Sequence, residues 1–132
     1  ELFSVAQEGS WPLKPTVLFL SRHATAFLHD LVRLLRSPMF VPRYTGLRLT
    51  STMVFHPQDW RPLSIEVLHS PAVLMSVLLC FEDNSARMRH EAYSALKCFI
   101  AFPPKCVPVR LLLFTNREAL AAALRAARTA HP

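Results

Sequence analysis

The segment from Ser70 to Pro104 most constrains the fold of this chain, because it is typical of two helices joined by a short turn. In its first half, one helix face is outlined by apolar residues at helical spacing, namely Val73, Leu74, Val77, Leu78 and Phe81. In its second half, the same period selects Met88, Ala92, Ala95, Leu96, Phe99 and Phe102. Ser70 and Ser85 are the expected N-caps. Because one hairpin cannot bury both of its apolar faces, the pattern predicts similar hairpins stacked on either side.

The composition favours a folded helical chain of one domain. Hydrophobic residues make up 52% of the 132 residues and charged residues only 18%, whereas disordered chains show the opposite balance. Only two glycines occur, so tight β-hairpin turns are disfavoured. Most of the 11 prolines fall where helices are expected to begin or end. We therefore predict an all-α, armadillo/HEAT-like helical-repeat solenoid rather than a four-helix bundle, whose helices would be longer and more uniform.

The chain divides into an irregular N-terminal arm over residues 1–15 and a helical-repeat domain over residues 16–132. Phe3 and Trp11 are expected to attach the arm to the first helices. Besides the central hairpin, helices are predicted over 16–37 with a break near residues 22–23, and over 40–55, 60–69, 105–114 and 119–130. Gly46 in the second of these predicts the close approach of a neighbouring helix.

Two further turns carry local signals for the start of a helix. Asp59 is the expected N-cap of the helix over 60–69. Thr115 and Glu118 fit the capping-box pattern, which predicts that the last helix begins after Thr115.

Charge and motifs exclude several classes of function. The net charge of +6 comes from 12 arginines and three lysines against nine acids, and the arginines are scattered singly, which suits carboxylates on a protein partner better than a nucleic acid. The three cysteines lack a C-x-x-C pair and are expected to be reduced. The six histidines lack metal-ligand spacing, and no nucleophile or phosphate-loop motif occurs. We therefore expect no enzyme activity, no cofactor and no metal.

No signal peptide or apolar run of membrane-spanning length is present in the sequence. A cytoplasmic location is expected. Association with the cytoskeleton or a cilium is the more specific form of this expectation. The start at Glu1 without a methionine suggests a fragment of a longer protein.

Residues 85–105, SARMRHEAYSALKCFIAFPPK, resemble a known family. They are similar to the pattern F-E-A-F-x-x-x-K-V-F-V-A-x-P-x-K in the C-terminal region of the calcium-binding protein 39 family, the mouse protein 25 type of kinase scaffold. The similarity extends upstream without a gap to about residue 16, and includes the register of Phe19, His23, Phe27, Leu47 and Trp60. It covers only the C-terminal, smaller part of a full family member.

The resemblance implies a right-handed helical-repeat rod without enzymatic activity. Members of the family bind germinal-centre-type protein kinases and a pseudokinase relative through a concave face. By this resemblance, Phe40, Arg48 and Trp60 keep the aromatic or basic character of concave-face contacts. Tyr44 and Pro57 stand where the family has arginines, so two charge-assisted contacts are missing. For each residue plain packing is the alternative, above all for Phe40 and Trp60.

The family also has a C-terminal hydrophobic pocket that takes a Trp-Glu-Phe tail of the pseudokinase. Val77 replaces a methionine of that pocket and keeps it apolar, and Thr115 replaces a nearby lysine. The loss of this lysine puts recognition of an acidic tail in doubt.

Two hypotheses follow from the sequence. The first is a non-catalytic scaffold that binds and activates a protein kinase or pseudokinase. The second is a structural subunit of a larger assembly, derived from that scaffold and lacking kinase contacts. In either case the second helix of each hairpin is expected to line a groove, with Arg48, Arg87 and Lys97 at its wall or rim.

Overall fold

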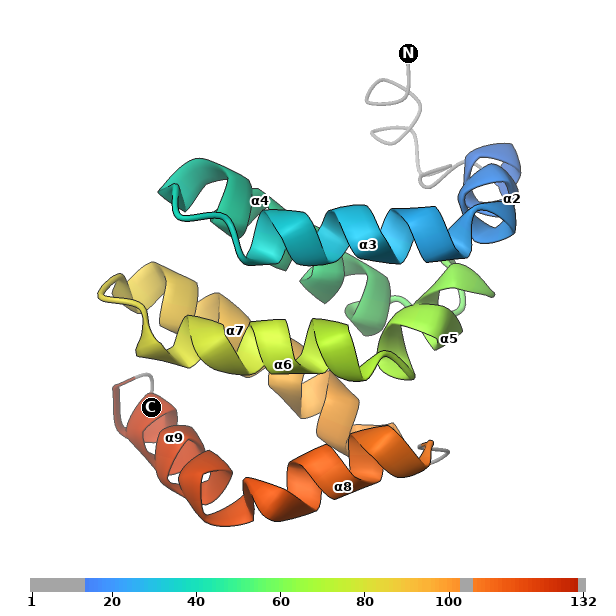
Figure 1. Cartoon of the computed structure of the whole chain (residues 1–132). Helices are drawn as coiled ribbons and strands as arrows, with labels where there is room; N and C mark the ends of the chain where they lie inside the picture. Colours follow the sequence, from blue (N-terminus) through green and yellow to red (C-terminus); the bar gives the residue numbers. More distant parts are fainter. Residues whose placement is uncertain (1–13, 103–105, 131–132) are drawn as a thin grey trace.

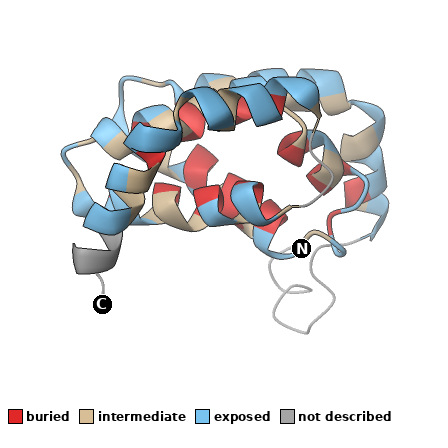
Figure 2. Ribbon diagram, turned by 90° about the horizontal axis from the view of Figure 1, so that it is seen from below, coloured by how far each residue is buried: buried red, intermediate tan, exposed pale blue. Residues whose placement is uncertain are grey.

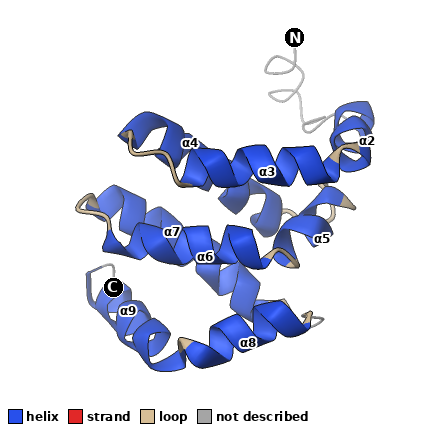
Figure 3. Cartoon of the chain, viewed as in Figure 1, coloured by secondary structure: helices blue, strands red, loops and turns tan. Residues whose placement is uncertain are grey.

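The structure, a computed structural model, describes residues 14–102 and 106–130, and within these ranges it is a stack of helices without strands (Figures 1 and 3). The elements are α2 (Lys14–Arg22), α3 (Ala24–Leu35), α4 (Phe40–Phe55), α5 (Leu63–Leu68), α6 (Pro71–Leu79), the 3₁₀ turn η2 (Cys80–Glu82), α7 (Ala86–Ala101), α8 (Val107–Thr115) and α9 (Arg117–Ala130). The predicted all-α class is confirmed. The expected attachment of Phe3 and Trp11 concerns residues outside the described ranges.

The helices form three-helix units that stack on one another. Helices α2, α3 and α4 make one unit, and α5, α6 and α7 make the next. Equivalent helices are in contact, α3 with α6 and α4 with α7, and in Figure 1 α4 and α7 lie behind α3 and α6. Helices α8 and α9 follow below them and continue the stack. This is the architecture of an armadillo/HEAT-like solenoid, in which each hairpin buries the apolar face of its neighbour.

Several predicted boundaries are confirmed by the structure. The chain breaks at His23 between α2 and α3, and α4 spans the predicted residues 40–55. At the central hairpin, the Ser70 hydroxyl accepts a hydrogen bond from the Val73 amide at 3.2 Å, and Ser85 does the same for Met88 at 3.3 Å. Both serines therefore act as the N-caps that their residue type predicts.

Two predicted helix starts are wrong. Asp59 does not cap a helix at residue 60, because α5 begins only at Leu63, after Pro62. The residue before a proline is disfavoured in the α region, which holds Arg61 out of the helix. Thr115 is the last residue of α8 and not an N-cap, because the Asn116 amide still donates to the Leu112 carbonyl at 3.2 Å.

The core lies between the layers of helices, where the buried residues face one another (Figure 2). In the central hairpin the predicted stripe is buried at Val73, Leu74, Val77, Met88, Ala92, Ala95, Leu96 and Phe99, whereas Leu78, Phe81 and Phe102 are only half-buried. In α3, Leu31 and Leu35 are fully buried.

The close approach predicted at Gly46 is confirmed. A Cβ atom built on this glycine would lie 2.9 Å from the Leu34 Cβ and 3.3 Å from the Leu35 backbone nitrogen. Since real Cβ contacts are longer than this, α3 and α4 pack at a distance that only glycine allows at this position.

Candidate functional site

Three of the predicted site residues form a row along the exposed side of α4. Phe40, Tyr44 and Arg48 are spaced four residues apart, so they lie on one face of the helix. The rings of Phe40 and Tyr44 stack with their centroids 5.5 Å apart and an angle of 11° between their planes. Phe40 is 39% exposed although it is aromatic. The row is therefore an apolar surface that ends in a cation.

Helix α7 adds two charged residues beside this row. The guanidinium carbon of Arg87 lies 5.3 Å from the centroid of the Tyr44 ring, which is a cation–π contact. Four residues further along both helices, Arg48 Nε lies 3.8 Å from Glu91 Oε2. The two contacts show that α4 and α7 run parallel and in register. We call the surface of Phe40, Tyr44, Arg48, Arg87 and Glu91 the α4/α7 face.

Arg48 is held in place but remains accessible. Its pKa is raised above the usual value, chiefly by a hydrogen bond with the Tyr44 side chain and then by the charge of Glu91. The side chain of Arg48 is 59% exposed, whereas that of Glu91 is 19% exposed. Because the Arg48 side chain is largely exposed, its pair with Glu91 contributes little to stability, and Arg48 can exchange Glu91 for a carboxylate of a partner.

The remaining predicted site residues do not join this face. Trp60 is 3% exposed and Val77 is 0% exposed, so both belong to the core, which is the packing alternative. Thr115 is exposed at the end of α8. Arg87 lies beside the row, whereas Lys97 lies over the Tyr93 ring at 4.7 Å, about a quarter turn around α7 from Arg87. That these cations border a groove stays a prediction.

A second surface feature is an apolar groove between the C-terminal half of α6 and the start of α9. It has a volume of about 350 Å³ and is lined from the α6 side by Met75, Leu78, Leu79, Phe81 and Glu82, and from the other side by Asn116 between α8 and α9 and by Ala119, Leu120 and Ala123 of α9. Val77 and Thr115 each precede a lining residue but are not among them. The lining carries a carboxylate, Glu82, and no cation.

Neither the role of Glu91 nor the groove was predicted from the sequence, although Leu78 and Phe81 of its lining belong to the predicted apolar stripe. Glu91 precedes the buried Ala92, so it lies at the edge of the apolar stripe of α7, and this position was a usable signal. The groove had no comparable signal, because its two walls are about 40 residues apart in the sequence and meet only through the stacking of α6 against the C-terminal helices.

Other side chains give no site of their own within the described residues. There, no three histidine, cysteine or acidic side chains gather as a metal ion would require. Burial raises the pKa of the Cys80 thiol to about 11 and also raises that of Cys98, so both thiols are protonated and weakly nucleophilic at neutral pH. Of the helices that the structure describes, none combines the length and the apolar character that crossing a bilayer needs.

The fold and the α4/α7 face define a helical-repeat protein with a solvent-accessible surface on the last helix of each three-helix unit. Comparison with known families is specific: residues 14–131 match the Mo25-like family, to which the chain belongs. It is similar to the calcium-binding protein 39-like proteins of mouse and human, each 24% identical over 102 residues. The aligned part is 77% of this chain but only 30% of each relative. No solved structure gives a significant match.

Proposed function

We propose that this chain is a non-catalytic scaffold segment that binds a protein kinase or pseudokinase through the α4/α7 face and favours its active state. The observation that carries the proposal is the row of Phe40, Tyr44 and Arg48 on the exposed side of α4, flanked by Arg87. Its membership of the Mo25-like family, a family of scaffold-type proteins, supports the same reading.

The chemistry of the face suits one kind of partner segment. Exposed aromatic rings bury well against the apolar side of an amphipathic helix, and the two guanidinium groups can each donate a pair of hydrogen bonds to a carboxylate. Because the cations are few and stand among apolar groups, a phosphate backbone fits poorly. We therefore propose a helix that bears a few acidic residues, such as a regulatory helix of a kinase.

The proposal is tested by binding to germinal-centre-type protein kinases. We expect Phe40→Ala and Arg48→Glu each to weaken binding at least tenfold, because each removes a contact near the centre of the face. The control is Arg125→Glu in α9, which makes the same charge change away from the face and should alter affinity less than twofold. Equal losses for the two reversals, or no retention of a kinase by the unmodified chain, would rule out this function.

The salt dependence separates a shaped site from diffuse attraction. A site with two guanidinium groups among aromatic rings should lose only a few-fold in affinity between 50 mM and 200 mM salt, whereas binding to many phosphates falls by about 10³ or more over this range. Isothermal titration with a kinase that the chain retains gives this slope directly. A steep slope would favour non-specific attraction of the basic chain to an acidic surface.

The alternative is a structural subunit of a larger assembly, and one observation favours it. Helix α8 exposes Val107, Leu111 and Phe114 on one side, at 55%, 59% and 63% exposure. An exposed apolar row at one end of a stack is usual where another subunit or repeat covers it. Purification of the chain alone distinguishes the two functions: a monodisperse monomer favours the binding scaffold, whereas aggregation that Leu111→Lys relieves favours the subunit.

The apolar groove is the proposed position of tail binding, and its charge differs from what the resemblance implies. Since Glu82 lies in the lining and no cation does, we expect a Trp-Glu-Phe peptide to bind weakly. Fluorescence titration with this peptide and with Trp-Gln-Phe tests the point. The neutral peptide should bind more tightly, and Glu82→Lys should reverse the order.

A further inference from the structure

The chain contains two Ser-Pro dipeptides, and their surroundings differ sharply. Ser70-Pro71 opens α6, where the Ser70 hydroxyl accepts from the Val73 amide at 3.2 Å and its carbonyl accepts from the Leu74 amide at 3.1 Å. Ser70 is thus part of the first helical turn. Release of its hydroxyl would unwind the start of α6, the helix that buries Val73, Leu74 and Val77 in the core.

Ser37-Pro38 lies instead in the turn between α3 and α4, where no helical hydrogen bond uses its hydroxyl. Ser37, Pro38 and Met39 form a non-helical linker, with Met39 extended and 68% exposed. A residue before a proline is also held in the extended region. Ser37 itself is half-buried, but it lies outside both helices, so a kinase reaches its hydroxyl without unfolding a helix.

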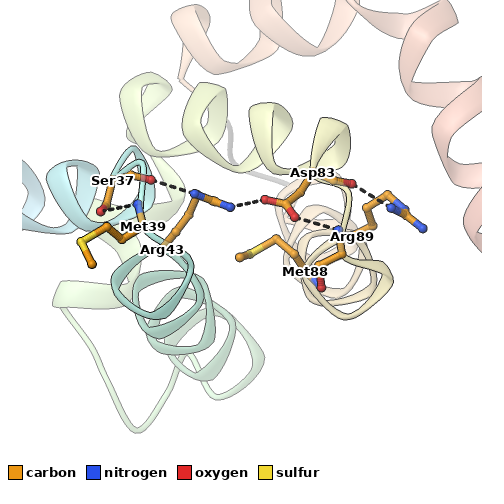
Figure 4. A network of polar contacts seen from close by, with 7 residues as sticks. Ser37, Met39, Arg43, Asp83, Met88 and Arg89 are labelled. Carbon is orange, nitrogen blue, oxygen red and sulfur yellow. Dashed lines mark hydrogen bonds and ion pairs between the residues drawn. The ribbon is translucent and has the colours of Figure 1, made fainter.

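The groups around Ser37 suit a dianionic phosphate. The Ser37 hydroxyl accepts from the Met39 amide at 3.2 Å, and the Ser37 carbonyl accepts from Arg43 Nη1 at 2.9 Å (Figure 4). Arg33 and Asp30 line a hollow of about 390 Å³ together with Ser37, and their charged groups lie 4.0 Å apart. Arg36 adjoins the serine in sequence, but its Nε donates to the Ser76 hydroxyl at 2.9 Å, so Arg43 is the cation nearest to Ser37. A phosphate on this hydroxyl would meet a backbone amide at the start of α4 and the guanidinium of Arg43.

From this geometry we propose that Ser37 is a phosphorylation site for a proline-directed protein kinase, whereas Ser70 is not. The γ-phosphoryl group of ATP moves to the Ser37 hydroxyl oxygen. The bond between that oxygen and phosphorus forms, the bond from the γ-phosphorus to the bridging oxygen breaks, and ADP leaves. The hydroxyl proton passes to the carboxylate base of the kinase. This modification is independent of whether the α4/α7 face binds a partner.

The phosphate would act on an ion pair that joins α4 to the turn before α7. The other terminal nitrogen of Arg43, Nη2, forms an ion pair with Asp83, in the turn between η2 and α7 (Figure 4). Asp83 in turn accepts from the Ser85 amide at 2.8 Å, and its carbonyl accepts from Arg89 at 2.7 Å. A phosphate on Ser37 would draw the Arg43 guanidinium toward itself and bring a second anion near the Asp83 carboxylate. The contact between the two turns would weaken.

The first experiment tests the site itself. The folded chain is incubated with a purified proline-directed kinase and ATP, and phosphates are counted by intact mass and placed by peptide mass spectrometry. We expect one phosphate, on Ser37, which Ser37→Ala abolishes. Ser70→Asn keeps an N-cap but removes the second acceptor, and should leave the yield unchanged. No incorporation, or incorporation mainly at Ser70, would overturn the proposal.

The second experiment tests the effect on the hairpin contact. Phosphorylated chain should melt about 3 °C below unmodified chain, because the ion pair of Arg43 and Asp83 is weakened. Asp83→Asn removes the carboxylate that the phosphate repels, so phosphorylation of this variant should change its melting temperature by less than half as much. An equal shift in both proteins would show that the phosphate does not act through Asp83.

Discussion

Helices α4 and α7 are equivalent helices of successive units, yet they differ in what they expose. Each has 16 residues, and the two lie side by side in parallel. Helix α7 buries an apolar stripe that includes Met88, Leu96 and Phe99. Helix α4 buries a glycine and two hydroxyl residues among its core positions, while it exposes Phe40, Val41 and Phe55 at 39%, 71% and 49%.

The difference indicates a division of roles between the two helices. Apart from Ile100, which is 39% exposed, the large apolar residues of α7 are directed into the core, so this helix contributes mainly to stability. The apolar residues of α4 are divided between the core and the surface, which is unfavourable for a free helix and useful for one that contacts a partner. Substitutions that remove apolar groups should therefore affect folding in α7 and binding in α4.

The largest expected effect is that of Phe99→Ala in α7. Phe99 is 1% exposed, so its truncation should lower the free energy of unfolding by about 3–5 kcal/mol. Phe55→Ala at the end of α4 removes the same atoms from a half-exposed position and should cost less than about 1 kcal/mol. Urea unfolding followed by circular dichroism measures both. Similar losses for the two variants would mean that α4 and α7 do not differ in role.

The next effect concerns the contact between α3 and α4. Gly46→Ala places a methyl group 2.9 Å from the Leu34 Cβ, so the helices must separate, at a cost of about 1–3 kcal/mol. Thr45→Ala, at the exposed neighbouring position, serves as the control and should stay within about 0.5 kcal/mol of the unmodified chain. If Gly46→Ala is instead stabilising, helix propensity outweighs the packing at this contact.

The two helix starts allow a reciprocal test. Helix α7 is capped by Ser85, whereas Met39 at the equivalent position of α4 has an extended backbone but gives no side-chain cap. Ser85→Ala should lower the free energy of unfolding by about 1 kcal/mol, and Met39→Ser should raise it by up to about 1 kcal/mol. Thermal melts of the single and double variants measure both changes. A loss of stability in Met39→Ser would show that the Met39 side chain contributes packing, although it is 68% exposed.

The smallest effect is on the pH dependence of stability. The pKa of Asp83 is lowered, chiefly by the hydrogen bond from the Ser85 amide and also by Arg43 and Arg89. A carboxylate with a lowered pKa in the folded state stabilises the fold above its unfolded pKa of about 4, and this contribution is lost as the pH falls through the folded value. Unfolding free energies measured between pH 7 and pH 2 should therefore decline less in Asp83→Asn than in the unmodified chain. Parallel curves would show that other carboxylates account for the decline.

Local patterns predicted most of the fold, and they failed where a tertiary or neighbouring constraint decided the outcome. Pro38 and Pro57 bracket α4 closely enough to give its bounds, and Ser70 and Ser85 are caps by residue type. Thr115 satisfies a capping-box pattern, but the hydrogen bond from Asn116 to Leu112 carries α8 past it. A pattern of four residues cannot show whether the residues between two adjacent helices end the first helix or begin the second.

The candidate site was predictable where it depends on one helix and not where it depends on the packing of two helices. Phe40, Tyr44 and Arg48 must share a face because of their spacing alone. Their contacts with Arg87 and Glu91 depend on how the two units stack, and this register has no signature within either helix. The burial of Trp60 was one of two alternatives that the sequence left open, and the choice between core packing and a surface contact depended on tertiary structure.

The parallel register of α4 and α7 also gives the α4/α7 face a direction. Four residues advance a helix by about 6 Å, so the row from Phe40 to Arg48 is about 12 Å long, aromatic at the N-terminal end of α4 and charged further along. A docked helix must place its apolar residues at the first end and its carboxylate at the second. The face therefore discriminates between a segment and the same segment in reverse orientation, so that a partner sequence and its reversed counterpart, identical in composition, would differ in affinity.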